Sequence, residues 1–312
     1  MFAKKFTRAI IELMKEHVFI VEQKFNNYKC KDFLKAKGVS REILLKVKDG
    51  GVYLNDLLVN NVNNLVKSGD KVKIVLPVDK KNPFVNPIKG QLKVCYEDDY
   101  MLAVYKPCGM PTHNSKGNAL TSLDQLVCGY FMPNEFTFRA VNRLDRDTSG
   151  IVLIAKDEFS SSLLGEMVKN GEINKTYTAV VCGVPNLEHF IIEKPIKRQT
   201  ESSMKRVCAP DGKYAKTECK LIKSLNDGLS LLEITLHTGR THQIRVQFAS
   251  RKTALYGDGK YGSKTNEKKT ALWSYRLSFN HPITKRMLSF SCLPDENTPW
   301  DLFGDSFKQN IE

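Results

Sequence analysis

The chain has 312 residues, of which 41% are hydrophobic and 26% charged. This size and balance are typical of a globular protein that buries a sizeable core, and they predict one large domain with a smaller one. The 48 Lys and Arg residues exceed the 34 Asp and Glu residues, which gives a net charge of +14. Such an excess favours a polyanionic partner such as nucleic acid, although charge alone does not identify one.

Cysteine usage and hydropathy indicate a protein of the reducing cytoplasm. The eight cysteines are scattered with no C-x-x-C pair, so neither a zinc knuckle nor a redox motif is indicated. Glu12 and Glu16 interrupt the apolar run near the N-terminus, which makes a poor signal peptide. No run of eighteen apolar residues occurs, which argues against a membrane span. We therefore expect a soluble, cytoplasmic protein.

A small N-terminal domain is predicted over residues 1–78, with its folded part beginning near residue 14. Residues 29–37 form a helix pattern that stops at Gly38, and Ser40 occupies the N-cap position of a second helix over residues 41–48. Short strands follow at residues 52–54, 57–59 and 72–76. The pattern is two helices followed by a small sheet.

The helix pair carries many basic side chains on its predicted exposed side. They are Lys31, Lys35, Lys37, Arg41, Lys46 and Lys48. An ordinary solvated surface is one interpretation. However, the order of helices, Gly-Gly-Val-Tyr-Leu-Asn and closing strand resembles the S4-type RNA-binding module, which implies RNA contacts from residues such as Lys35 and Arg41.

Three prolines among the polar residues 77–90 predict a linker at residues 79–90. Beyond it, short strand patterns alternate with a few helix patterns, which predicts an α+β catalytic domain over residues 91–303 on a large mixed, mainly antiparallel sheet. Residues 304–312 are left as a tail. The strands are expected at residues 92–96, 101–105, 151–155, 177–182, 231–236 and 287–290, and the helices at residues 122–131, 160–169 and 241–250.

Asp145 stands out because Arg143 and Arg146 flank it in a run that ends at Gly150 before an apolar strand. Nearby guanidinium groups favour an ionised carboxylate, which suits a nucleophile or a base. A surface salt-bridge loop with local turn hydrogen bonds explains the same residues equally well. The local charge pattern does not decide between these interpretations.

Five segments in order make the chain resemble the RluA-type pseudouridine synthases. They are residues 106–113, 143–150, 175–179, 238–246 and 257–262. The resemblance implies an enzyme that isomerises uridine to pseudouridine in RNA with no cofactor and no metal, and the family analogy suggests a monomer. An S4-like module favours ribosomal RNA as the partner, with tRNA as the alternative.

The resemblance also implies roles for individual residues. Asp145 is the expected catalytic aspartate, by attack on the sugar or by proton abstraction, and Arg240 is expected to pair with it. Tyr177 is expected to stack on the extruded base, and Arg143 to enter the RNA helix in its place. Tyr177 as a half-buried sheet residue and Arg240 as a structural loop residue are the alternatives. The further expected substrate or RNA contacts are Leu144, Lys106, Pro107, His242, Gln243 and Arg245, with Lys106 and Pro107 also shaping a loop beside the site.

Three positions depart from the family pattern. Asn142 and Gln247 stand where His is frequent, and Trp273-Ser274 stands where His-Ala is common. They bring details of RNA contact into question, not the reaction.

Two other functions fit an acid in an arginine-rich loop, a nucleoside hydrolase and a catalytically decayed RNA-binding or ribosome-assembly factor. The joint presence of Asp145, Tyr177 and Arg240 argues against decay.

Overall fold

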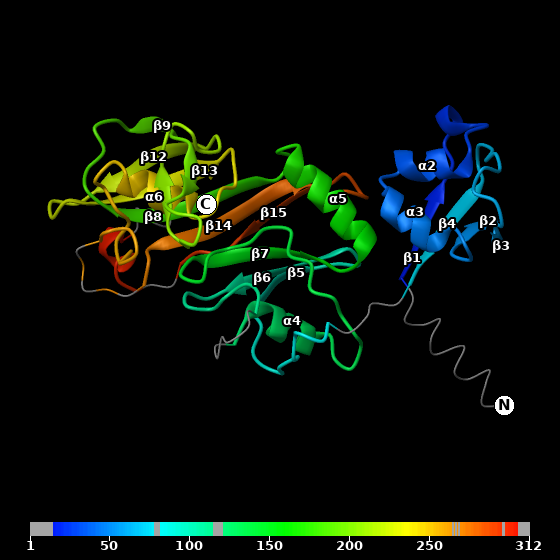
Figure 1. Ribbon diagram of the computed structural model, residues 1–312, viewed down its shortest axis with the longest axis horizontal. Helices are drawn as coiled ribbons and strands as arrows, with labels where there is room; N and C mark the ends of the chain where they lie inside the picture. The colour runs from blue at the N-terminus through cyan, green and yellow to red at the C-terminus, as the bar shows by residue number, and fades with distance from the viewer. Residues whose placement is uncertain are drawn as a thin grey trace.

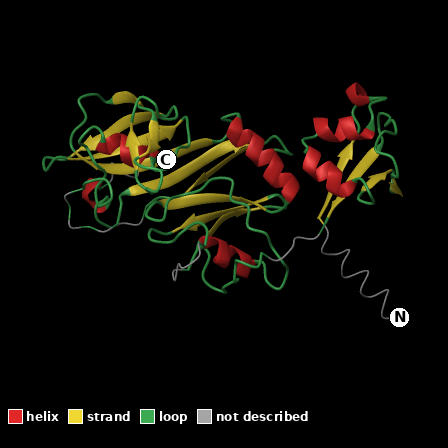
Figure 2. Cartoon of the chain, in the orientation of Figure 1, coloured by secondary structure: helices red, strands yellow, loops and turns green. Residues whose placement is uncertain are grey.

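The computed structural model describes residues 15–77, 82–114, 121–263, 265, 267, 269–294 and 297–304. These residues form an α+β fold with a small N-terminal unit and a large unit built on one extended, mainly antiparallel sheet, as predicted (Figures 1 and 2). The helices are η1 (Gln23–Phe25), α2 (Cys30–Ala36), α3 (Arg41–Val47), α4 (Leu123–Tyr130), α5 (Glu158–Lys169), α6 (Gln243–Ala249) and η2 (Asp301–Phe303). The strands are β1 (Lys15–Ile20), β2 (Val52–Leu54), β3 (Leu57–Leu58), β4 (Lys71–Leu76), β5 (Val94–Glu97), β6 (Met101–Lys106), β7 (Ser149–Ala155), β8 (Asn174–Cys182), β9 (His189–Glu193), β10 (Ile196–Arg198), β11 (Arg206–Cys208), β12 (Lys216–Ser224), β13 (Leu229–Leu236), β14 (Leu272–Asn280) and β15 (Met287–Ser291).

The N-terminal unit packs α2 and α3 against a sheet of order β1-β4-β2-β3. Gly38 ends the first helix region with φ of +88°, a conformation that favours glycine, and the Ser40 hydroxyl accepts a hydrogen bond from the Ile43 backbone N–H. Both helices lie where the sequence predicts them. Strand β1 was not predicted, and it pairs antiparallel with β4 at one edge.

The N-terminal unit is docked on α5 of the large unit. Phe159, from the first turn of α5, is fully buried in the hydrophobic cluster of the N-terminal unit, and its ring meets those of His17 and Phe19. The His17 Nε2 atom lies 3.2 Å from the Asp157 carboxylate, with both side chains about 95% buried, and Lys46 pairs with Glu158 at 2.5 Å. The contact is thus a small core with a buried polar pair beside it.

The sheet of the large unit runs in the order β5-β6-β7-β14-β8-β13-β12-β9, with β15 also paired to β14. The pairing is antiparallel except between β14 and β7. Alternate residues of the central strands enter two different hydrophobic clusters, so both sheet faces are buried. One cluster is covered by α4 and α6, and the other by α5 and the C-terminal residues Trp300 and Phe303.

Residues 82–90, in the segment predicted to be a linker, form no helix or strand but pack along α4. Val85 is buried in the core, the Ile88 backbone N–H donates to the Gln125 carbonyl, and a Cβ atom on Gly129 would lie 2.1 Å from the Ile88 carbonyl oxygen. The segment is therefore held on the large unit. In the described part of the chain, no helix is long and apolar enough to span a membrane.

Candidate active site

The segment that follows β6 contacts the loop that carries Asp145 and holds its backbone. The Lys106 ammonium group donates hydrogen bonds to the carbonyls of Pro107, Met110 and Arg146, at 3.0, 2.8 and 3.1 Å. The Thr112 hydroxyl donates to the Leu144 carbonyl at 2.7 Å. Because these bonds fix the backbone on both sides of Asp145, the carboxylate is presented by a rigid loop.

Asn142 and Gly150 close this loop onto the sheet. The Asn142 amide donates to the Ile151 carbonyl at 3.0 Å and accepts from the Leu153 N–H at 2.7 Å, so the residue that replaces a frequent His is a backbone bridge. Gly150 has φ of +117°, and a Cβ atom there would lie 2.2 Å from the Ser274 carbonyl oxygen. Glycine is therefore required where β7 meets β14.

Asp145 faces two groups from the region of α6. Its side chain is 25% exposed, and its Oδ2 atom lies 3.5 Å from Nη1 of Arg245 and 3.7 Å from Nε2 of His242. Arg245 is buried and binds Asp258 through two hydrogen bonds of 2.7 and 2.8 Å. Burial alone would lower the pKa of Arg245, but the hydrogen bonds and charge of Asp258, with the charge of Asp145, raise it. The guanidinium is thus a fixed positive charge beside the carboxylate.

The expected pairing of Arg240 with Asp145 is corrected by this geometry. The Arg240 side chain is exposed and its Nε atom donates to the Tyr214 carbonyl at 2.9 Å, while Arg245 takes the place beside Asp145. The chain adopts a left-handed conformation at His242, with φ of +57°, immediately before α6 begins. This change of direction separates the two arginines.

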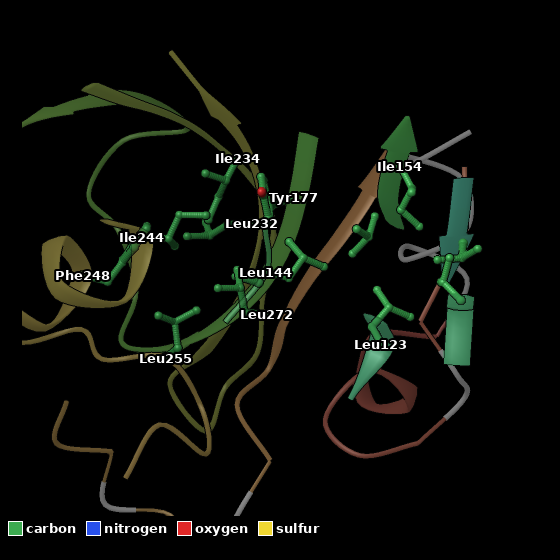
Figure 3. Close-up of a cluster of buried hydrophobic side chains, with 14 of the residues drawn as sticks. Leu123, Leu144, Ile154, Tyr177, Leu232, Ile234, Ile244, Phe248, Leu255 and Leu272 are labelled. Atoms are coloured by element: carbon green, nitrogen blue, oxygen red, sulfur yellow. The ribbon is translucent and has the colours of Figure 1, made fainter. Parts of the chain in front are cut away.

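Tyr177 lies on β8 opposite Ser274 of β14 and Ile234 of β13, and only 6% of the residue is exposed (Figure 3). Burial raises the pKa of Tyr177 to about 12, the neighbouring Ser274 side chain acts against this, and the Asp145 charge adds to it. The hydroxyl is therefore neutral at physiological pH. The structure places Arg245 beside Asp145, while Tyr177 lies in the core cluster that also contains Leu144, the neighbour of Asp145 in the chain.

Several residues that were expected to contact RNA are buried and serve the fold. Leu144 belongs to the core cluster that contains Tyr177, Lys106 is fully buried under the loop, and Arg245 is held by Asp258 (Figure 3). Gln243 is buried and accepts hydrogen bonds from the Thr238 hydroxyl and the Arg240 N–H. Because these side chains are nearly inaccessible, we reassign them as supports of the site.

The remaining expected contacts keep some access to solvent. Arg143 is exposed at the start of the loop, and Pro107 is partly exposed. His242 is about 10% exposed in its side chain and faces Asp145. In the N-terminal unit, Lys35 and Arg41 are both exposed.

The sequence gives the residues of the segment 257–262 no individual role. Asp258 proves to be the partner of Arg245, and the Tyr261 hydroxyl lies 2.6 Å from Nδ1 of His242. The only sequence signal for them is the glycine spacing of Gly-Asp-x-x-Tyr-Gly, which indicates a turn. No cluster of three or more His, Cys, Asp or Glu side chains suited to a metal ion occurs within the described ranges.

Comparison with known proteins identifies the family. Residues 100–250 match the RNA pseudouridylate synthase family. The chain is 32% identical to the uncharacterized RNA pseudouridine synthase YjbO of Bacillus subtilis, over 83% of this chain and 93% of the relative. It is 30% identical to the ribosomal large subunit pseudouridine synthase D of Zymomonas mobilis, over 85% of this chain and 87% of that relative.

A solved structure, human RNA pseudouridylate synthase domain containing 1, has the same fold, with a TM-score of 0.56 at 22% identity over 67% of this chain and 85% of that one. The match, the relatives and the clustering of motif residues around one carboxylate agree. The chain therefore belongs to the RluA-type RNA pseudouridine synthases, isomerases that act on RNA.

Proposed function

We propose that Asp145 is the catalytic residue with which this enzyme isomerises specific uridines of structured RNA, with ribosomal RNA as the preferred substrate. The observation that carries the proposal is the position of the Asp145 carboxylate, partly open to solvent on one side and 3.5 Å from the buried Arg245 guanidinium on the other. A fixed cation at this distance orients the carboxylate and attracts its negative charge.

The reaction breaks the bond between the ribose and a nitrogen of uracil, turns the base, and forms a new bond to a ring carbon, which loses its proton. Asp145 serves this sequence either by attack on the sugar or by removing a proton from it, and both routes use an ionised carboxylate. Arg245 stabilises that charge without being consumed, because Asp258 holds it in place through two hydrogen bonds.

Access to the uridine requires that it leave the RNA stack. Exposed Arg143, two residues before Asp145, is placed to occupy the vacated position and to offset part of the unstacking cost, which is a few kcal/mol. Tyr177 is 6% exposed on the buried face of β8, so its stacking on the extruded base requires that RNA binding uncover the ring. The neutral hydroxyl of Tyr177 does not need to transfer a proton in this arrangement.

We further propose that residues 15–77 form an S4-like RNA-binding domain. Lys35 and Arg41 are exposed on the helix pair, and Lys35 pairs with Asp32 only at 3.4 Å, whereas Lys37 and Lys46 pair with Glu22 and Glu158 at 2.5 Å. The named substrate of relatives such as the ribosomal large subunit pseudouridine synthase D supports ribosomal RNA over tRNA. We expect the enzyme to act as a cytoplasmic monomer.

The test is to map pseudouridines in cellular RNA of strains with and without the gene, and to complement the deletion with single variants. Asp147→Asn is a matched control for Asp145→Asn, because both side chains are 25% exposed in one loop but Asp147 pairs with exposed Arg146. We expect the deletion to lose specific sites, Asp147→Asn to restore them, and Asp145→Asn not to. Restoration by Asp145→Asn, or a deletion that loses no site, refutes the proposal.

A further inference from the structure

A chain of contacts connects Asp145 to a basic hairpin at the rim of the site. Asp145 Oδ2 lies 3.7 Å from His242 Nε2, His242 Nδ1 lies 2.6 Å from the Tyr261 hydroxyl, and that hydroxyl accepts a 3.0 Å hydrogen bond from the Arg206 backbone N–H. Arg206 begins β11. The catalytic loop and the hairpin, far apart in sequence, are therefore joined through two side chains.

The hydrogen positions along this path follow from its chemistry. The Tyr261 oxygen accepts from the Arg206 N–H, and its single proton is then free to be donated to His242 Nδ1. Burial lowers the pKa of His242, against the opposing charge of Asp145, so the ring is neutral at pH 7. Its one proton then lies on Nε2 and faces the Asp145 carboxylate. The opposite tautomer would turn a nitrogen lone pair toward a negative charge.

The hairpin formed by β10 and β11 presents charge to solvent next to this path. Lys197, Arg198 and Lys205 are exposed, with Lys197 in an exposed 2.8 Å ion pair with Asp211, and Met204 in the connecting loop is 75% exposed. The inner side of the hairpin packs on the site, because buried Ile196 shares a small cluster with Val246 of α6 and with the Tyr261 ring. The hairpin is thus packed against Tyr261.

We propose that Tyr261 is a positioning residue that couples the docking of RNA phosphates on the β10–β11 hairpin to the orientation of Asp145, through His242. The inference rests on the proposed role of Asp145 and adds a means by which bound RNA completes the site. Arg245 is fixed by Asp258, so His242 is the adjustable neighbour of the carboxylate.

The distances define what docking has to change. A hydrogen bond from a ring nitrogen to a carboxylate is about 2.7–3.2 Å long, whereas His242 Nε2 lies 3.7 Å from Asp145. A movement of less than about 1 Å, transmitted through the short Tyr261–His242 bond, closes this contact. Catalytic hydrogen bonds that are long in the free enzyme commonly tighten in the substrate complex.

The experiment uses the full-length enzyme and total RNA from the deletion strain, labelled with uridine that carries tritium at carbon 5. Release of tritium reports isomerisation under single-turnover conditions, and RNA binding is measured separately by filter retention. Tyr261→Phe keeps the ring and removes only the hydroxyl. We expect about a 5- to 10-fold lower saturated rate, the effect of one lost hydrogen bond, with unchanged RNA affinity.

Controls separate coupling from a general loss of structure. Tyr214→Phe removes an exposed hydroxyl that bonds Glu193 and should leave rate and affinity unchanged. The double variant Tyr261→Phe/His242→Gln should be no slower than the slower single variant, because both break the same path. Lys197→Gln/Arg198→Gln should reduce both affinity and saturated rate in the wild type, but only affinity in the Tyr261→Phe background.

Three outcomes overturn the inference alone. They are a wild-type saturated rate for Tyr261→Phe, additive losses in the double variant, and a hairpin effect on rate that persists without the Tyr261 hydroxyl. If the wild-type enzyme itself releases no tritium from this RNA, the proposed function fails and the coupling fails with it. The two failures are therefore distinguishable in one set of measurements.

Discussion

Replacing Asp258 by Asn tests whether the site depends on a buried ion pair behind the catalytic loop. The Asp258 and Arg245 side chains are 0% and 3% exposed, so the variant leaves a buried guanidinium with only Asp145, at 3.5 Å, as an acidic partner. Breaking a buried pair on one side costs about 3–5 kcal/mol of unfolding free energy. For a protein of this size that corresponds to a fall in Tm of roughly 5–8 °C.

Differential scanning calorimetry and urea unfolding measure this loss, with Glu166→Gln as the control. Glu166 pairs with Lys169 at 3.0 Å, but both side chains are mostly exposed, so the control should change the unfolding free energy by less than about 0.5 kcal/mol. The double variant Asp258→Asn/Arg245→Gln removes both charges and should regain most of the stability.

Activity separates the two roles of Arg245. The double variant should fold yet lose about 100-fold or more in saturated rate, because Asp145 has lost its fixed cation. An Asp258→Asn variant that melts with the wild type would refute the energetic argument. A fully active double variant would show that Asp145 does not need the guanidinium.

Three further predictions concern pH and the supports of the site. Tyr177→Phe should have the same pH–rate profile as the wild type from pH 7 to 10, because the Tyr177 pKa of about 12 keeps the hydroxyl protonated; an alkaline limb present only in the wild type would contradict this. Lys106→Met should lower stability at pH 7 by about 1–3 kcal/mol, since three carbonyls lose their donor. Burial lowers the pKa of Lys106 to about 8, so the cost of its buried charge disappears as pH rises above 8. The difference in unfolding free energy between the wild type and Lys106→Met, measured by urea titration, should therefore widen above pH 8. A difference that narrows would contradict the buried, charged state of Lys106. Asp157→Asn keeps the N-cap of α5 but loses the charge facing His17. Burial alone would raise the pKa of Asp157, but the interactions with His17 and Ser160 hold this pKa below its ordinary value. The resulting stabilisation of the folded state, about 1.5–3 kcal/mol, is therefore present above about pH 4. It is lost as the pH falls through the lower pKa of the folded state. A wild-type advantage that persists at pH 2 would count against it.

Elements with strong local signals were predictable from the sequence. The helix after Ser40 and the apolar strand after Gly150 lie where capping and β-branched content placed them. Strands β12 and β14 were missed, because Lys216–Ser224 alternates charged residues and Leu272–Asn280 mixes polar with aromatic ones. Their place in the sheet is decided by pairing with distant strands, which local propensity does not contain.

The candidate site likewise contains residues that the sequence predicts and residues that only the structure reveals. Asp145 and Tyr177 follow from motifs, and their roles stay predictions. The choice between Arg240 and Arg245 as the partner of Asp145 depends on the left-handed turn at His242 and on Asp258, which lies thirteen residues after Arg245. Neither is visible from the spacing of arginines. The burial of Lys106 and Gln243 was likewise unforeseeable, because polar side chains rarely reveal in sequence that backbone carbonyls will satisfy them.

The insertion of Phe159 into the N-terminal unit bears on how the protein is made. Residues 15–77 leave the ribosome first, but the ring that completes their core is encoded about 80 residues later, a delay of roughly 4–16 s at ordinary rates of synthesis. During that interval the hydrophobic surface around His17 and Phe19 has no cover. The nascent N-terminal unit therefore exposes apolar surface until α5 emerges, and we expect that grafting this unit onto another enzyme requires the matching face of α5 to be transferred with it.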